Sequence, residues 1–179
     1  MPNLFDLSEV ELRSWLESQS EKPFRSSQIL SWIYQKKADS WEKMTDLSKE
    51  LRTKLSHHFL LNSLKCVRFL DSSDGDTTKF LWELVDGKFV ESVLIRAPER
   101  RTVCVSSQVG CPARCAFCAS GKKGLMRNLS TGEIVEQVVQ IDRVLKEKGE
   151  RVSHVVFMGM GEPLMNWSAV DPALTILND

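Results

Sequence analysis

Three cysteines stand close together in this 179-residue chain, at Cys111, Cys115 and Cys118. Their spacing, Cys-x3-Cys-x2-Cys, places three thiols on one short segment, with Phe117 directly before the last of them. Four-iron clusters are usually held by four thiolates, so a set of three leaves one iron open to a ligand that is not protein. The pattern therefore predicts an iron–sulfur site at which chemistry can take place.

Two other uses of these cysteines have to be weighed. Structural zinc usually takes two ligand pairs from separate places, and the remaining candidate ligands show no second paired spacing; they are Cys66, Cys104, His57 and His58. A disulfide framework suits a small secreted chain, whereas this chain has five cysteines, an odd number, and no signal peptide at its start. Zinc stays the alternative, and we expect a reducing, cytoplasmic location.

A second segment that could bind a ligand is Gly159-Met-Gly161-Glu162. Glycines let a backbone approach a ligand closely, and the Glu162 carboxylate is an acceptor suited to an amino group. A dinucleotide-binding turn would need a third glycine where Leu164 stands. A structural tight turn is the stronger alternative, and the residues alone leave the two interpretations open.

These segments resemble the RlmN/Cfr family of radical S-adenosylmethionine (SAM) RNA adenosine methyltransferases, and within it the RlmN branch. Four blocks carry the resemblance, in this order: Cys104-Val-Ser-Ser-Gln-Val-Gly-Cys111, Cys115-Ala-Phe-Cys118, Arg127-Asn-Leu and Met158-Gly-Met-Gly-Glu-Pro-Leu-Met-Asn166. The resemblance covers essentially the whole chain, weakly at the N-terminus and strongly from about Glu91 onward.

The resemblance implies two cofactors and the residues that bind them. Cys111, Cys115 and Cys118 would hold a [4Fe-4S] cluster, and Gly161 and Glu162 would line the site for SAM. The free iron would bind the amino and carboxylate groups of SAM, and reductive cleavage would give a 5′-deoxyadenosyl radical. A flavodoxin-type reductant would be the electron donor.

The resemblance also implies a reaction. Glu91 matches the family's general base, or proton acceptor, and Cys104 matches its resolving thiol. The expected reaction uses two SAM molecules to methylate C2 of adenosine in large-subunit ribosomal RNA and in tRNA. A C8-methylating, Cfr-like enzyme and a non-catalytic RNA-binding remnant are the alternatives. On the residues alone, Cys104 is better explained as a plain buried thiol of a strand.

Glu91 has two interpretations on the residues alone. Side chains alternate along a strand, so Glu91 shares a face with Val93 and Ile95. Desolvation among such neighbours would suit the carboxylate to accept a proton near neutral pH. If instead Val90 and Leu94 mark the buried side, Glu91 is merely solvated. The residues favour the second interpretation and the resemblance favours the first.

The fold class that we expect is α/β, beginning with a helical module over residues 1–62. A capping box between Ser8 and Glu11 opens the first helix, and the apolar spacing predicts two more helices around 29–33 and 47–55. The resemblance implies that this module is an accessory RNA-binding domain. Its aromatic residues could stack on bases, although at helical spacing such residues are more often core; they are Trp15, Trp32, Tyr34 and Trp41.

An antiparallel β extension is expected over residues 63–101. Apolar positions alternate there, and Asp74-Gly75 and Asp86-Gly87 are turn signals, which together predict a meander of two hairpins.

Residues 102–179 are expected to be an incomplete radical SAM (β/α) barrel. A strand over 102–109, a helix opened by a capping box at Ser130 and Glu133, and a short buried strand over His154–Met158 predict a parallel pair with a right-handed crossover. Sites in such sheets gather beyond the carboxyl ends of the strands. The cysteine segment and the glycine segment should therefore meet on one rim.

Composition excludes a few classes of protein. The chain is 42% hydrophobic and 27% charged, which is typical of an ordinary globular protein, and no apolar run approaches the length of a bilayer span. Its formal net charge is zero, but residues 96–127 hold seven basic residues against the single acid Glu99. Attraction to phosphate is one interpretation of this segment, and a solvated face is the other.

The sequence departs from the family in one respect. No cysteine follows Cys118, so the cysteine that carries the methyl group in the family has no counterpart in these residues. A complete barrel also takes roughly 200 to 250 residues. We expect the chain to correspond to the N-terminal half of a family member, to be inactive in RNA methylation alone, and to expose apolar sheet surface.

Overall fold

The computed structural model describes residues 1–178. The chain divides into two compact units, Met1–Asn62 and Ser63–Asp179. Each unit has its own core, and each is described by itself.

The first unit is helical, as the sequence predicts. It contains α1 (Glu9–Ser18), α2 (Arg25–Leu30) and α3 (Lys49–His58), with the short turns η1 (Leu4–Asp6), η2 (Ser31–Gln35) and η3 (Trp41–Lys43). The predicted capping box opens α1, because Ser8 N–H donates to Glu11 at 2.8 Å and Glu11 N–H donates to the Ser8 hydroxyl at 3.3 Å. One apolar stripe of these helices is buried; it includes Leu12, Leu16, Ile29, Ile33, Leu51 and Leu55.

Two aromatic residues of this unit take part in its packing. Trp15 contacts Phe59 edge to face, with ring centroids 4.8 Å apart, and Tyr34 meets Phe5 in the same way at 5.8 Å. Burial raises the pKa of the Tyr34 hydroxyl. Packing therefore accounts for Trp15 and Tyr34 without a role in base stacking.

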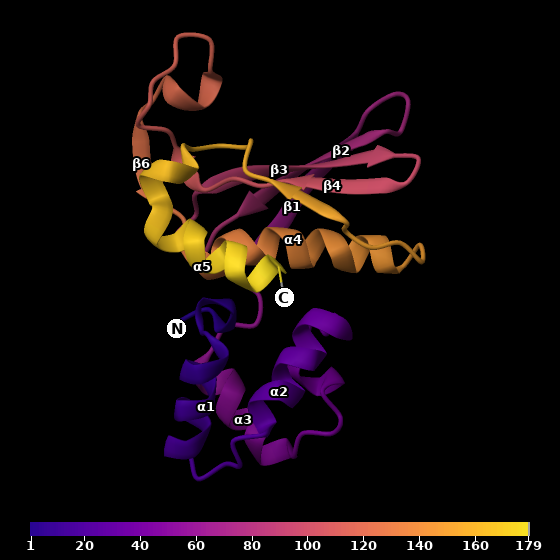
Figure 1. The fold of residues 1–179 in the computed structure, drawn as a ribbon, viewed down its shortest axis with the longest axis vertical. Coiled ribbons are helices and arrows are strands. Elements are labelled where there is room, and N and C mark those ends of the chain that lie inside the picture. The colour runs from indigo at the N-terminus through magenta and orange to yellow at the C-terminus, as the bar shows by residue number, and fades with distance from the viewer. Residues whose placement is uncertain (179) are drawn as a thin grey trace. The chain divides into compact units, whose positions relative to one another are not determined.

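The second unit is built on a five-stranded sheet, in the order β1-β2-β3-β4-β7 (Figure 1). Its elements are β1 (Lys65–Asp71), β2 (Thr77–Glu83), β3 (Phe89–Ala97), β4 (Arg100–Cys104), β5 (Gln108–Gly110), η4 (Ala119–Gly121), β6 (Leu125–Asn128), α4 (Thr131–Lys146), β7 (His154–Val156), η5 (Pro163–Asn166) and α5 (Trp167–Asn178). Strands β5 and β6 form a separate antiparallel pair.

The strand pairings confirm the predicted meander and the predicted parallel pair, although the strand expected over 102–109 ends at Cys104 and Gln108–Gly110 belongs to a separate pair. Strands β1 to β4 are antiparallel neighbours, and the predicted β1–β2 and β2–β3 turns contain Gly75 and Gly87 at positive φ. Strand β7 then pairs with β4 in parallel. Residues on either side of position 101 thus share one sheet, and the boundary there stays a prediction.

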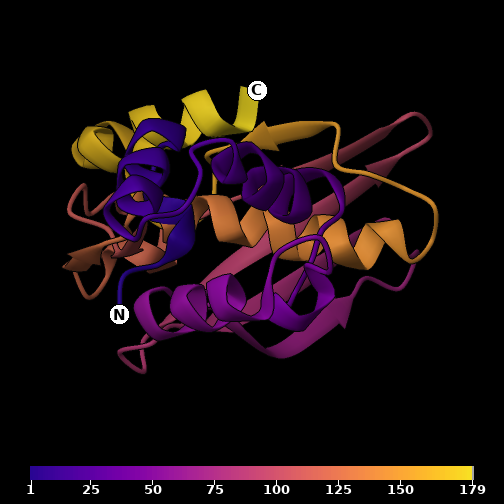
Figure 2. The same cartoon turned by 90° about the horizontal axis from the view of Figure 1, so that it is seen from below.

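Helix α4 covers one face of this sheet, as the two views in Figures 1 and 2 agree. The predicted capping box is present, and the helix buries an apolar stripe that includes Ile134, Val138, Ile141 and Leu145. Its buried Glu136 carboxylate accepts hydrogen bonds from the N–H groups of Ser63 and Leu64 at 2.9 and 3.0 Å. The helix therefore fixes the start of the unit as well as the sheet.

The other face of the sheet is more open. Phe89, Ile95 and Leu70 are exposed large hydrophobic residues of its strands, in line with the apolar sheet surface that the sequence predicts. The expectation that the strand at His154 is buried is wrong, because β7 is an edge strand with His154 exposed and Val155 and Val156 only partly covered. Within residues 1–178, no helix combines the length and the apolar character that crossing a membrane requires.

Candidate functional site

Two segments meet beyond the carboxyl ends of β4 and β7. We call residues 106–108 the stem, residues 111–124 the cysteine loop and residues 158–162 the glycine loop. Ser107 N–H and Gln108 N–H both donate to the Met160 carbonyl oxygen, at 2.8 and 3.2 Å, and Gly159 N–H donates to the Val105 carbonyl at 3.0 Å. The stem that leads into the cysteine loop thus meets the glycine loop on one rim, as predicted, and the place of the thiols beside the glycine loop stays a prediction.

Both glycines of the glycine loop lie against the stem. A Cβ atom added at Gly159 would stand 2.7 Å from the Val105 carbonyl oxygen, and one added at Gly161 would stand 2.7 Å from the backbone nitrogen of Gln108. Gly161 also has a φ of +103°, which side chains rarely adopt. Glycine is therefore required at these two positions because the glycine loop and the stem, two segments of this chain, approach each other closely.

Buried polar side chains fasten the stem on every side. The Ser106 hydroxyl donates to the Glu91 carbonyl at 2.5 Å and accepts from Met160 N–H at 2.9 Å. The Gln137 amide of α4 binds the Ser106 backbone twice, accepting from its N–H at 2.9 Å and donating to its carbonyl at 3.0 Å. Ser106, Gln137 and Ser107 are all 2% exposed or less. The stem is thereby tied to α4, to β3 and to the glycine loop.

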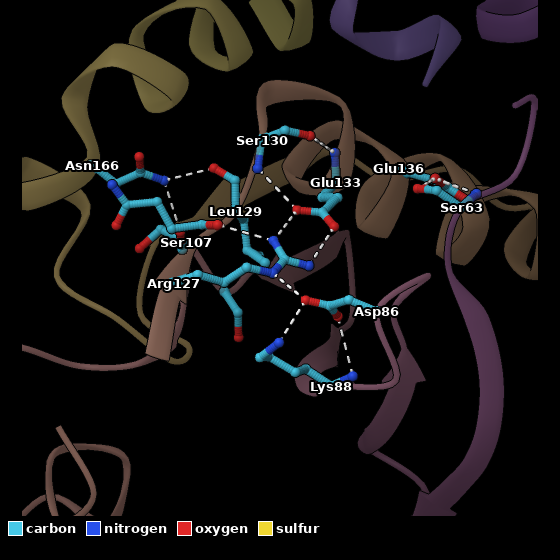
Figure 3. Close-up of polar contacts among 12 residues, drawn as sticks. Ser63, Asp86, Lys88, Ser107, Arg127, Leu129, Ser130, Glu133, Glu136 and Asn166 are labelled. Atoms are coloured by element: carbon cyan, nitrogen blue, oxygen red, sulfur yellow. Dashed lines mark hydrogen bonds and ion pairs between the residues drawn. The ribbon is translucent and has the colours of Figure 1, made fainter. Parts of the chain in front are cut away.

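The chain leaves the cysteine loop through residues 125–129, which we call the exit limb. Two more side-chain amides connect the stem with this limb. The Asn166 amide donates to the carbonyls of Ser107 and Leu129, at 2.8 and 2.9 Å (Figure 3). Gln108 donates to the Asn128 side chain at 2.9 Å and accepts from Glu162 N–H at 2.8 Å. Of these residues, only Glu162 was given a role from the sequence, and the others were used only as members of the matched blocks.

The three cysteines lie on a loop that projects from the sheet (Figure 1). Cys111 is buried at its neck, where its N–H donates to the Gly124 carbonyl at 3.2 Å, while Cys115 is exposed and Cys118 partly exposed. Hydrogen bonds from the backbone N–H groups of Ser120 and then Gly121 lower the pKa of the Cys118 thiol. This donor chemistry suits a metal cluster, because the thiolate is the ligand form.

The described conformation does not gather the three sulfurs. Within residues 1–178, no group of three or more His, Cys, Asp or Glu side chains is arranged to hold a metal ion. Cys115 and Cys118 share a turn, with Cys118 N–H donating to the Cys115 carbonyl at 3.0 Å, and Cys111 stands apart at the neck. The predicted ligand set fits by residue type and stays a prediction in its geometry.

The neck of the cysteine loop depends on a glycine that the sequence argument missed. Gly110 has a φ of +77°, and a Cβ atom there would overlap the Gly124 carbonyl oxygen. Because Gly110 has no side chain, the segment that enters the cysteine loop can contact Gly124, at the other end of that loop, just before Cys111. Its signal in the sequence is its position at the end of a strand directly before the first cysteine.

Glu91 and Cys104 lie on the same face of the sheet, opposite α4. Val93 is paired with Cys104 across β3 and β4, and Glu91 is two residues from Val93 on the same side. Cys104 is buried, which raises the pKa of its thiol. The register thus brings the predicted proton acceptor and the predicted resolving thiol to neighbouring positions.

Of the two interpretations of Glu91, the structure supports the solvated one, which the residues favour, and corrects the desolvated one, which the resemblance favours. Its side chain is 41% exposed, and its carboxylate lies 3.0 Å from Lys79 Nζ. Val90, Ser92 and Leu94, which alternate with it, are the buried residues of β3. Helix α4 covers their face and leaves the face of Glu91 open, so hydrophobic neighbours do not exclude water from the carboxylate.

The comparisons with known proteins agree with this arrangement. Residues 105–179 match the radical SAM superfamily, and residues 2–61 match the ribosomal RNA large subunit methyltransferase N-terminal domain. The fold and the cysteine-bearing rim thus define a radical SAM protein. A solved structure, that of a radical SAM methyltransferase from Sphaerobacter thermophilus, is 42% identical with a TM-score of 0.96, and the match covers 100% of this chain and 52% of that one.

Relatives of known sequence narrow the class to a family. "Probable dual-specificity RNA methyltransferase RlmN 2" of Protochlamydia amoebophila is 56% identical over 97% of this chain and 48% of its own length. "Probable dual-specificity RNA methyltransferase RlmN" of Bacillus licheniformis is 51% identical over 99% of this chain and 49% of its own length. The chain belongs to the RlmN family of radical SAM methyltransferases, which confirms the resemblance. It spans about half the length of the curated relatives it matches.

Proposed function

We propose that this chain carries the cofactor-binding part of a radical SAM RNA methyltransferase. One observation carries the proposal: the cysteine loop and the glycine loop leave from one hydrogen-bonded rim, where Ser107 and Gln108 both donate to Met160. A ligand bound at the thiols would therefore lie beside the residues proposed to bind SAM. Residues 102–179 would form the start of the (β/α) barrel, residues 63–101 its β extension, and residues 1–62 an accessory RNA-binding domain.

The proposed cluster ligands are Cys111, Cys115 and Cys118. A bound [4Fe-4S] cluster would supply the electron that cleaves SAM, delivered to it by a flavodoxin-type reductant. The backbone N–H groups of Ser120 and Gly121 would help by keeping Cys118 in its thiolate form. The chain's task at this end of the site is to hold the thiols on the rim.

The glycine loop would bind the methionine part of SAM. The Leu164 N–H donates to one carboxylate oxygen of Glu162 at 3.1 Å, which orients the side chain at the start of η5. The carboxylate is suited to accept from the amino group of SAM, and Gly161, whose Cβ position faces Gln108, would keep the loop close against the stem.

Glu91 and Cys104 would act on the RNA. Glu91 would accept the proton from C2 of adenosine, which requires the Lys79 ammonium, now 3.0 Å away, to move aside. Since burial raises the pKa of Cys104, its thiol stays protonated near neutral pH and needs a base before it can attack an adduct. Glu91 lies on the same face as Cys104 and could accept either proton, but it would have to release the first before it accepts the second.

The proposed substrate is an adenosine in large-subunit ribosomal RNA and in tRNA. The printed names of the relatives and the matched N-terminal domain support an RNA substrate. The cysteine loop also presents exposed basic side chains that suit phosphate, namely Arg114, Lys122 and Lys123. No cysteine follows Cys118 in the 179 residues, so we expect cofactor chemistry from this chain without RNA methylation.

The test is anaerobic reconstitution of the 179-residue chain with iron and sulfide, followed by incubation with SAM, a flavodoxin system and RNA. We expect 5′-deoxyadenosine to form from SAM, no methyl group to enter RNA, and a C115A variant to lose the cofactor chemistry. A chain that takes up no iron or sulfide and only binds RNA, with salt-dependent affinity, would replace this proposal with the RNA-binding remnant.

A further inference from the structure

Arg127 lies in β6, on the limb by which the chain leaves the cysteine loop, and it is bound on two sides (Figure 3). Its Nη1 and Nη2 donate to the two carboxylate oxygens of Glu133, at 2.7 and 2.8 Å. Its Nε donates to the Asp86 carboxylate at 2.7 Å. A guanidinium that donates to both oxygens of a carboxylate is fixed in position and in orientation.

The two carboxylates come from elements far apart in the chain. Glu133 is in the first turn of α4, where Ser130 N–H also donates to it at 2.9 Å. Asp86 is in the turn between β2 and β3, where it accepts from Lys88 Nζ at 2.8 Å. Arg127 therefore joins three segments: the exit limb of the cysteine loop, the start of α4 and the β2–β3 turn.

The charges in this cluster are partly shielded from water. The side chains of Arg127, Asp86 and Glu133 are 29%, 35% and 12% exposed. The hydrogen bond from Arg127 holds the pKa of the Asp86 carboxyl well below its usual range, and hydrogen bonds to Glu133 and Asp86 raise the pKa of Arg127. Asp86 and Arg127 therefore stay charged at neutral pH, and the Arg127 guanidinium lies against both carboxylates.

We propose that Arg127, held by Glu133 and Asp86, is a positioning residue for the cluster thiols. The inference rests on the proposed function. The β5–β6 ladder has only three residue pairs and an irregularity between Val109 and Gly110, so pairing alone restrains the exit limb weakly. The Arg127 contacts fix that limb to α4 and to the turn that leads into β3, which carries Glu91. They thereby set where the thiols stand relative to the rest of the site.

The chain offers a matched control. Arg101 donates from Nε and Nη2 to the two carboxylate oxygens of Glu150, at 2.9 and 2.5 Å, so it also forms a two-pronged pair within the same unit. Arg101 stands near the start of β4, whereas the cysteine loop follows the end of that strand. Breaking this pair perturbs the unit without touching the limb.

The experiment compares R127Q, R127K and D86N with R101Q in the reconstituted 179-residue chain. The measurement is the rate at which excess chelator removes iron, with the thermal midpoint of each variant recorded beside it. Loss of a partner that orients metal ligands typically costs 10–100-fold in affinity, so we expect R127Q to release iron about 10-fold faster. R127K and D86N should fall between R127Q and wild type, and R101Q should match wild type.

A second readout uses the chain without iron. Trypsin should cleave after the exposed Lys122 and Lys123 faster in R127Q than in R101Q when the two variants have equal thermal midpoints. Equal iron release from R127Q and wild type, or equal acceleration in R127Q and R101Q, would overturn the positioning role and leave the proposed function standing. A wild-type chain that takes up no iron would overturn both.

Discussion

The stem and the cysteine loop are neighbours in the chain, yet they are held in different ways. The stem residues Ser106, Ser107 and Gln108 are at most 2% exposed, and side chains from α4 and η5 and the backbone of the glycine loop bond to them. On the cysteine loop, Phe117 is 94% exposed, and the three thiols are not gathered in the described part of the chain.

This difference indicates that the stem and the cysteine loop have different tasks in the candidate site. The platform for the cofactor is set by the chain's own hydrogen bonds and by glycines that permit close backbone contact. The cysteine loop has few such bonds, so under the proposed function its final geometry would depend on what the thiols bind. Metal binding often completes a site in this manner, because binding energy orders ligands that the fold leaves apart.

The largest expected effect on stability comes from a substitution at Gly110, in the neck that joins the stem to the cysteine loop. A Gly110→Ala substitution forces a side chain into positive φ and against the Gly124 carbonyl, so we expect a loss of about 3 kcal/mol or more in the free energy of unfolding. Urea unfolding measures it. Gly87→Ala is the control, since its φ is +75° with nothing within 4 Å of the added Cβ; it should cost about 1–2 kcal/mol. Equal losses in the two variants would show that the two ends of the cysteine loop do not need to be in close contact at Gly110.

The second effect concerns the stem itself. Ser106→Ala removes the hydroxyl that joins the Glu91 carbonyl to Met160 N–H, which leaves two backbone groups without that partner and should cost about 1–3 kcal/mol. The control is Ser56→Ala, because the Ser56 hydroxyl is exposed and donates only within its own helix; it should change stability by less than about 0.5 kcal/mol. A Ser106→Ala chain as stable as wild type in urea would show that the stem is not held through this hydroxyl.

A smaller effect should appear in acid. Arg127 lowers the pKa of Asp86 in the folded chain, below the value of about 3.9 in the unfolded chain. The stabilisation from this carboxylate is therefore present above about pH 4 and is lost as the pH falls through the folded value. Between neutral pH and pH 3, the free energy of unfolding should fall less in the Asp86→Asn chain than in wild type. Urea unfolding at each pH measures this difference. Parallel curves for the two chains would contradict the contribution of Asp86.

The smallest effect is expected on the open face of the sheet. Lys79 and Glu91 form a pair whose side chains are 47% and 41% exposed, and such pairs contribute about 0–1 kcal/mol. Lys79→Ala should therefore change the free energy of unfolding by less than about 0.5 kcal/mol. A larger loss in urea unfolding would mean that this face is covered and that the pair is shielded from water.

Local patterns in the sequence predicted much of the fold. The capping boxes at Ser8 and Ser130, the hairpin turns at Gly75 and Gly87 and the parallel strand pair are all present. The capping boxes and the turns depend on residues a few positions apart, where propensity and hydrogen bonding act locally. The parallel pair joins distant residues, such as Thr102 and His154, and followed from the order strand, helix, strand. The meeting of the two loops on one rim followed from the general rule for parallel strands.

The bonds that fasten the site were not predictable in the same way. Gln137 binds Ser106 from 31 residues away, and Arg127 reaches Asp86 across 41, so neither pair leaves a local pattern. Alternation shows which residues share a face but not which face a helix will cover, so Glu91 was left with two interpretations; its 41% exposure supports the solvated one, which the residues favoured. The glycines at 159 and 161 were singled out for contact with a ligand, whereas the stem already requires them.

The contrast between the stem and the cysteine loop can be measured directly by amide hydrogen exchange, followed by mass spectrometry, on the chain without iron and after anaerobic reconstitution. We predict that bound iron and sulfide slow exchange in residues 111–124 and leave residues 105–108 and 159–162 unchanged. If exchange in the cysteine loop stays unchanged in a chain that has taken up iron, the cluster does not order this loop. If exchange slows equally in all three segments, the stem and the glycine loop are not fixed before the cluster binds. Either result would contradict the account.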